Sequence, residues 1–111
     1  MSVTTSTRNT VYQRDNFQCI HCGSMKGLVL RQRSHTGNGS AENLVTFCVV
    51  DDDRITNDQS FSDLAMNYGW KLRTWEQPEN RAVYYQADDE WWYLTSRGTR
   101  TRAGETADYG R

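Results

Sequence analysis

The chain has 111 residues, the length of one small domain, and its formal net charge is −1. Residues 1–50 carry five Lys or Arg against two acidic residues, and residues 51–111 carry eight against twelve. This balance excludes the dense basic footprint of a strong nucleic-acid binder. No apolar run reaches the roughly 20 residues that cross a bilayer, so we expect no membrane partner.

The chain holds three cysteines, and an odd number argues against a closed disulfide framework. Thiols that stay reduced fit a cytoplasmic location, which we therefore expect. A domain of this length is only marginally stable by itself, so a bound metal or a second copy would help it to fold. The oligomeric state is left open.

The first half predicts one helix and two strands. Residues 1–7 are rich in Ser and Thr and predict a disordered N-terminus. A weak helical pattern without Gly or Pro follows and predicts a short helix over residues 7–17. Residues 27–32 and 43–50 have the alternation and the β-branched content of strands. We expect them to pair antiparallel across the loop at 34–42, whose glycines and Asn tolerate positive φ.

The second half predicts a helix and a hairpin. The apolar residues near position 64 are spaced i, i+3, i+4 and i+7, as on one face of an α-helix; they are Phe61, Leu64, Ala65 and Tyr68. Ser60 is suited to cap this helix at its start and Gly69 to end it. The aromatic runs 83–85 and 91–94 flank a polar turn and predict a β-hairpin. Residues 97–111 show no periodicity and predict a flexible tail.

Two cysteines at a C-x-x-C spacing, Cys19 and Cys22, place two thiols within reach of one metal ion. Cys48 lies in the segment expected to return beside them, so it is a candidate third ligand. The alternative is that the three thiols pack as small apolar groups.

The acidic run Asp51, Asp52 and Asp53 has three interpretations. It supplies negative charge to the first turn of a following helix, where the helix dipole favours it. It binds Mg²⁺ or Ca²⁺ through carboxylate oxygens. It forms a surface that repels phosphate unless a cation intervenes. The first interpretation requires the least and is preferred.

The predicted elements follow the order helix, C-x-x-C turn, strand, Gly-rich loop, strand, helix. Within this order lie the segments RDNFQCIHCG (14–23) and GNGSAENLVTFC (37–48). This order resembles the HNH endonucleases, and within them the small HNH proteins of actinobacterial phages. NYGWKLRTWEQP (67–78) and the aromatic hairpin also look like the C-terminal portion found in that group. The resemblance implies an α+β fold with a small ββα-metal core, a zinc-knuckle turn, an N-terminal helix and a C-terminal aromatic hairpin, in a domain spanning residues 8–96.

In the family, a His at the end of the first strand is the general base, a middle Asn orients the loop or the base, and a further His or Asn binds a divalent cation. The resemblance places Asn43 at the middle position and Gln32 at the His position. Glutamine has no titratable proton and cannot act as a base. An alternative base is His35, which would form a compacted triad with Asn43 and Asp52 around Mg²⁺ or Mn²⁺. Otherwise His35 is an exposed loop residue.

The second cysteine pair of the family is also incomplete, because Asp51 stands where a Cys is expected. A carboxylate can bind zinc, so Cys19, Cys22, Cys48 and Asp51 form a candidate structural zinc site. His21, between the first two cysteines, is expected to point to the surface.

The resemblance with these departures indicates a degenerate HNH domain that has lost nuclease activity and binds a host protein or double-stranded DNA. Arg31 and Arg33 are the candidate DNA contacts. The alternative is an active, divalent-metal-dependent nickase that uses His35. For a phage-encoded protein, the expected location is the cytoplasm of the infected bacterium.

Overall fold

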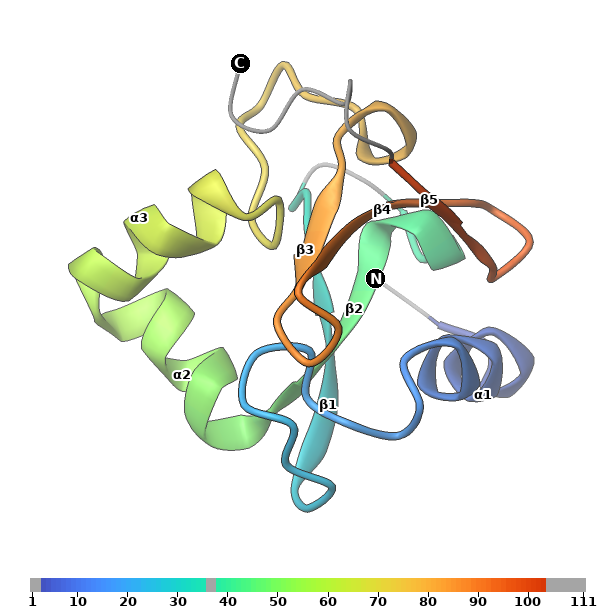
Figure 1. Cartoon of the computed structure of the whole chain (residues 1–111), viewed down its shortest axis with the longest axis horizontal. Coiled ribbons are helices and arrows are strands. Elements are labelled where there is room, and N and C mark those ends of the chain that lie inside the picture. Colours follow the sequence, from blue (N-terminus) through green and yellow to red (C-terminus); the bar gives the residue numbers. More distant parts are fainter. Residues whose placement is uncertain (1–2, 36–37, 104–111) are drawn as a thin grey trace.

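The structure is a computed structural model that describes residues 3–35 and 38–103. In chain order the elements are the helix α1 (Thr5–Arg14), the strand β1 (Leu28–Gln32), the short helix η1 (Ala41–Asn43), the strand β2 (Leu44–Cys48), the helices α2 (Val49–Asn57) and α3 (Gln59–Asn67), the short helix η2 (Pro78–Asn80), and the strands β3 (Val83–Tyr85), β4 (Glu90–Leu94) and β5 (Arg100–Arg102) (Figure 1). The predicted α+β class is confirmed. None of the described helices is both long and apolar enough to cross a bilayer.

The antiparallel hairpin β1–β2 lies between α1 on one side and α2 and α3 on the other (Figure 1). Successive side chains of a strand point to opposite faces, and both faces of this hairpin are covered. Leu30 and Leu44 pack with Val11 of α1, whereas Val45 and Phe47 belong to the larger core under α2 and α3. The hairpin is therefore the central layer of this part of the fold.

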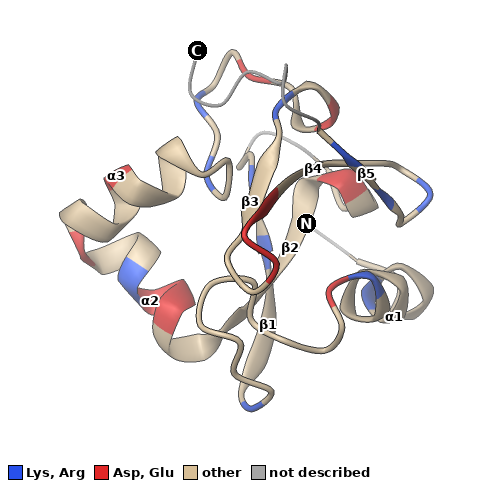
Figure 2. Cartoon of the chain, in the orientation of Figure 1, with Lys and Arg blue, Asp and Glu red and all other residues tan. Residues whose placement is uncertain are grey.

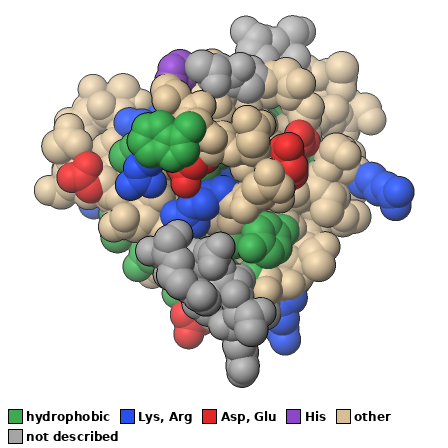
Figure 3. Space-filling model, turned by 90° about the horizontal axis from the view of Figure 1, so that it is seen from above, with side chains coloured by type: hydrophobic (Ala, Val, Ile, Leu, Met, Phe, Trp, Pro, Cys, Tyr) green, Lys and Arg blue, Asp and Glu red, His purple; other side chains and the backbone are tan. Residues whose placement is uncertain are grey.

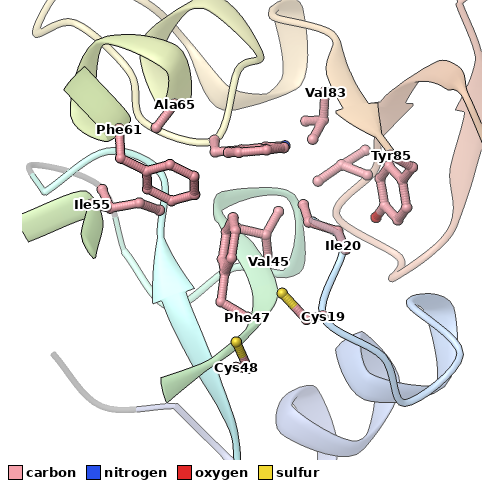
Figure 4. Packing of buried hydrophobic residues seen from close by; sticks show 12 residues of the cluster. Cys19, Ile20, Val45, Phe47, Cys48, Ile55, Phe61, Ala65, Val83 and Tyr85 are labelled. Atoms are coloured by element: carbon pink, nitrogen blue, oxygen red, sulfur yellow. The ribbon is translucent and has the colours of Figure 1, made fainter. Parts of the chain in front are cut away.

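The larger core is built around Trp70, which is completely buried. The rings of Phe47, Phe61 and Tyr68 pack against it, and its indole N–H donates to the Tyr84 carbonyl at 2.8 Å. Figure 4 shows the surrounding side chains arriving from the hairpin, the helices and β3. Aromatic rings thus lie at the centre of the core in a chain with a modest apolar content.

A buried ion pair joins α1 to both sheets. Arg14 binds the carboxylate of Asp15 through two nitrogens and also donates to the Leu44 carbonyl at 2.7 Å. Asp15 in turn accepts from the Thr46 backbone N–H at 3.1 Å and from the Tyr85 hydroxyl at 2.5 Å. Each buried charge is therefore paired and hydrogen-bonded, as burial requires.

The strands β3, β4 and β5 form a second antiparallel sheet (Figure 1). The hairpin β3–β4 was predicted, and its aromatic residues cover the core: Trp91 packs on Tyr68 and Tyr84, and the Arg100 guanidinium lies over Trp92. The strand β5 differs from the prediction, because it lies within the residues expected to be a flexible tail. Its pairing with β4 orders residues 100–102, and residues 104–111 of that predicted tail lie outside the described part of the chain.

Two predicted boundaries of the first half shift. Helix α1 begins at Thr5, inside the segment predicted to be disordered, because the Thr4 hydroxyl caps it by accepting from the Thr7 N–H. It ends at Arg14, before the predicted residue 17, because Asn16 and Phe17 adopt positive φ angles of 59° and 53°.

Two further boundaries shift around the acidic run. The strand β2 stops at Cys48 and the helix α2 begins at Val49, where a strand to residue 50 was predicted. The helix α3 is capped by the Asp58 carboxylate and not by Ser60. It ends before Gly69, whose φ is +76°, as the sequence indicated.

Candidate metal centre

Four side chains from two separate segments converge where the turn after α1 meets the junction of β2 and α2. They are Cys19 and Cys22 of the turn, Cys48 at the end of β2, and Asp51 in the first turn of α2. One ligand atom from each lies within 4.8 Å of the others. Cys22 is exposed and the other three are buried, and Figure 4 shows Cys19 and Cys48 at one edge of the core.

Backbone hydrogen bonds hold the C-x-x-C turn against β2. The Gly23 N–H donates to the Cys19 carbonyl at 2.9 Å, and Gly23 has a φ of +79°, which glycine adopts without strain. The Ile20 N–H donates to the Thr46 carbonyl at 3.0 Å. The tight turn places both cysteine thiols on one side, and the bond to β2 aligns them with Cys48.

Two of the distances within the cluster match those around a tetrahedral zinc ion, and all four ligand atoms lie within 4.8 Å of one another. Zinc–sulfur bonds of about 2.3 Å and zinc–oxygen bonds of about 2.0 Å separate two tetrahedral sulfurs by about 3.8 Å, and a sulfur from an oxygen by about 3.5 Å. The Sγ atoms of Cys22 and Cys48 are 3.7 Å apart, and Cys19 Sγ is 3.4 Å from Asp51 Oδ2. The four residues could therefore bind a metal ion with little rearrangement.

Without a metal, burial makes the thiols hard to ionise. Burial raises the pKa of Cys19 to about 12, although backbone N–H groups around the turn oppose this effect. Burial also raises the pKa of Cys48. For Asp51, burial disfavours the carboxylate, but hydrogen bonds from His21, Cys22 and Cys19 outweigh it and hold its pKa below the usual value. A bound cation would reverse the balance at the sulfurs, because it stabilises thiolates directly.

His21 does not point to the surface, contrary to the prediction. Its side chain is only 20% exposed, and its ring packs edge-on against Phe61 and Trp70. Its Nδ1 lies 2.9 Å from Asp51 Oδ2, and since a carboxylate only accepts, this nitrogen carries the proton. The ring thus orients the carboxylate of Asp51 toward the cysteines, in the manner of the outer groups that support metal ligands.

Asp51 and Asp52 lie in the first turn of α2, as the preferred interpretation expected, and Asp53 follows them in the same helix. Cys48 caps this helix, since its Sγ accepts from the Asp51 N–H at 3.4 Å. Asp52 is paired with Arg31: Nη1 of the guanidinium lies 2.9 Å from the carboxylate Oδ1 and 3.2 Å from the backbone carbonyl of Asp52. The candidate ligand of a divalent cation, Asp52, is therefore already paired with a guanidinium.

The residue at the expected catalytic position faces away from α2. Gln32 is opposite Leu44 in the hairpin register, and Leu44 packs toward α1. The neighbouring Arg31 faces α2, because it bonds to Asp52. Residues 31 and 32 point to opposite faces of the strand.

No hydrogen bond or ion pair among the described residues links the three members of the predicted compacted triad. Asn43 is buried and fully engaged in the loop: its Oδ1 accepts from the Ser34 N–H at 2.9 Å, and its Nδ2 donates to the carbonyls of Ser34 and Asn38. His35 is exposed and borders a hollow beside α3. Within residues 3–35 and 38–103, one cluster of three or more Cys, His or acidic ligands forms, and it includes neither His35 nor Asp52.

The prediction that Arg33 contacts DNA is wrong. Arg33 is 1% exposed, and its guanidinium donates to four backbone carbonyls, those of Gly69, Glu42, Pro78 and Arg81, at 2.6 to 2.8 Å. Burial lowers its pKa to about 9, which leaves it charged at neutral pH. An Arg directly after a strand carries no local signal of such burial, because the acceptors come from segments up to 48 residues away.

No family model, curated protein or solved structure matches the chain. What the chain does must therefore be inferred from the geometry of its own residues. Among the described residues that geometry comprises one cluster of candidate metal ligands, the ion pair of Asp52 with Arg31, and a loop held by Asn43 and Arg33.

Proposed function

We propose that this chain is a zinc-stapled, HNH-like domain without nuclease activity that works by binding a partner protein. The order β1, loop, β2, α2 with a cysteine pair beside it supports the likeness to the HNH core. The engaged amide of Asn43 supports it as well, since the resemblance assigns the middle Asn a role in orienting the loop.

In this proposal zinc is held by the three thiolates and the carboxylate of Asp51. A structural zinc site uses four protein ligands, whereas a catalytic zinc keeps one position open for water. Four ligand atoms within 4.8 Å of one another fill a tetrahedral shell. The metal therefore contributes stability by joining the turn at Cys19 to the start of α2, and it offers no place for a substrate.

The observation that carries the loss of activity is the ion pair between Arg31 and Asp52. Phosphodiester hydrolysis by this family requires a base and a divalent cation beside the same phosphate. Asp52 is the candidate cation ligand, and a guanidinium 2.9 Å away already neutralises it. A divalent cation would have to displace the Arg31 guanidinium from Asp52, and the positive charge of Arg31 would repel it.

The charge distribution favours a protein over DNA as the partner. Of the five basic residues in the first half, Arg14 and Arg33 are buried and Arg31 is paired with Asp52. Arg8 and Lys26 are the exposed ones. Lys and Arg are scattered over the elements, and acidic residues occur on α2, on α3 and at the β3–β4 turn (Figure 2). A surface of this kind gains little from phosphate contacts.

A plasmid-nicking assay tests the proposal. Supercoiled plasmid is incubated with the zinc-loaded protein and Mg²⁺ or Mn²⁺, and the nicked circles are measured. We expect no conversion above a protein-free control. Nicking by the wild-type chain that requires the divalent ion and disappears in His35→Ala would overturn the proposal in favour of the nickase.

Two histidine variants test the origin of the scaffold. Gln32→His places an imidazole toward α1, so we expect it to stay inactive. Arg31→His frees Asp52 and places an imidazole on the same face as its carboxylate. Divalent-dependent nicking in Arg31→His alone would support an HNH scaffold whose chemistry is blocked at this position. Affinity capture from an actinobacterial lysate would identify the partner.

A further inference from the structure

Trp75 is the most exposed large apolar side chain among the described residues, at 76% exposure. It lies in the loop between α3 and η2. Figure 3 shows one face of the molecule, on which apolar groups stand among basic and acidic side chains. Exposing an indole costs free energy in water, and Trp is the residue most enriched at the energetic centres of protein interfaces. The other three tryptophans are buried or packed on the core, so Trp75 stands apart from them.

The loop that presents Trp75 is held by charged hydrogen bonds. The Glu76 carboxylate accepts from the Arg73 backbone N–H at 2.8 Å and from the Arg81 guanidinium at 3.2 Å. Arg81 also donates to the carbonyls of Met66 and Asn67 at the end of α3. The indole is thus carried on a braced loop, so that binding costs little conformational entropy.

A hollow of about 370 Å³ opens on one side of Trp75. Its apolar lining residues are Met66, Leu72 and Trp75, and its basic lining residues are Lys71 and Arg73, with His35 and Thr74 beside them. The volume is sufficient for one large apolar side chain with part of its backbone.

The charges around this hollow select an acidic ligand. No Asp or Glu is among its described lining residues. Lys71 donates to the neutral Ser62 hydroxyl at 2.8 Å, and Arg73 is 3.7 Å from the Glu76 carboxylate, a long ion pair. Both cations therefore have capacity for a further carboxylate.

The two neighbouring hollows are lined by carboxylates. In one, which shares Trp75, the carboxylate of Glu76 is paired with Arg81, and the next is lined by Glu42 and Glu79. A nucleic-acid backbone crossing this face would meet these carboxylates, whereas a short peptide with local negative charge would not. Charge complementarity is thus confined to the hollow between Trp75 and Lys71.

We propose that this face binds an acidic segment of a partner protein, which seats one apolar side chain against Trp75 and Leu72 and directs carboxylates to Lys71 and Arg73. The inference rests on the proposed function, a protein-binding domain, and names the chemistry of its partner. It adds a site that the metal centre and the HNH-like core do not contain.

The test is selection from a displayed random-peptide library with the zinc-loaded full chain. We expect enriched peptides to share one Leu, Ile, Phe or Met flanked by Asp or Glu. A synthetic peptide of that consensus should bind Trp75→Ala about thirtyfold more weakly, as for a central interface aromatic. Lys71→Glu should weaken it by roughly tenfold. Phe17→Ala, a change at another exposed aromatic, is the matched control and should bind normally.

Three results would overturn the inference: no enrichment, a basic or purely polar consensus, or equal binding by Trp75→Ala with its zinc content and circular dichroism unchanged. Concentration-dependent self-association that Trp75→Ala abolishes would also overturn it, because a second copy would then occupy the face. The proposed function fails by a different result, plasmid nicking by the wild-type chain. A partner captured equally by wild type and Trp75→Ala would leave the proposed function standing and reject this site.

Discussion

Replacing Arg33 with Met should destabilise the domain more than any change at an exposed arginine. Met is similar in length and apolar, so it fills the same space without a charge. The substitution removes the donors that join β1 to the segments around Gly69, Glu42 and Pro78. It therefore tests whether this buried cation, once a candidate DNA contact, is instead the brace of the loop that carries Trp75.

The size of the effect follows from the contacts of the guanidinium. It makes four hydrogen bonds to carbonyls at 2.6 to 2.8 Å. Bonds to a charged group contribute about 1.5–3 kcal/mol each. Burying the cation costs several kcal/mol, which offsets part of that gain. We expect a net loss of about 3–5 kcal/mol from a domain whose total stability is of order 5–15 kcal/mol.

Urea unfolding of the zinc-loaded protein, followed by tryptophan fluorescence, measures this loss. Arg8→Met is the matched control, because Arg8 is exposed on α1, and it should change stability by less than about 0.5 kcal/mol. Arg33→Lys should rescue little, since one ammonium cannot reach carbonyls arranged for a planar fork. If Arg33→Met and Arg8→Met unfold at the same urea concentration, the assignment of Arg33 as a structural brace is refuted.

Other substitutions test separate parts of the structure. Gly69→Ala should cost at least about 3 kcal/mol in urea unfolding, because its Cβ would lie 2.1 Å from a backbone oxygen. Gly23→Ala, at a similar positive φ but with open space around it, should cost only about 1 kcal/mol, and equal losses would contradict the packing. Tyr85→Phe should cost about 1.5–3 kcal/mol by removing the bond to Asp15. Burial raises the pKa of Tyr85, so the unfolded chain loses this proton first, and the difference should shrink above about pH 10; a constant difference would argue against the buried phenol. Asp51→Cys should tighten zinc binding and Asp51→Asn weaken it in competition with a chromophoric chelator, whereas equal affinities would remove Asp51 from the ligand set.

The elements that the sequence predicted well are those whose formation is signalled by a pattern of neighbouring residues. The helix around Leu64 has an unbroken apolar stripe and a terminal glycine, and the β3–β4 hairpin has two aromatic runs around a polar turn. The candidate ligands Cys19, Cys22 and Cys48 were also predicted, since the C-x-x-C spacing implies a returning segment, and the resemblance to the HNH family added Asp51. The structure brings these four residues together.

The features that sequence reasoning missed depend on distant contacts. The burial of Arg33 requires carbonyls from three later segments, and the contact of His21 with Asp51 requires the core around Trp70. The strand β5 has no apolar alternation and forms because the edge of β4 accepts it. Val49 and Val50 favour a strand by composition, but the Cys48 cap and the acidic first turn begin a helix there.

Native mass spectrometry of the purified chain, titrated with Zn²⁺ and then Mn²⁺, tests the central claim most directly, namely a structural metal site without a catalytic one. The account predicts one zinc ion per wild-type chain, none in Cys22→Ser, and no additional bound Mn²⁺. A chain that binds no zinc would contradict the proposed structural zinc site. A bound Mn²⁺ that is lost in His35→Ala or Asp52→Asn would contradict the absence of a catalytic centre.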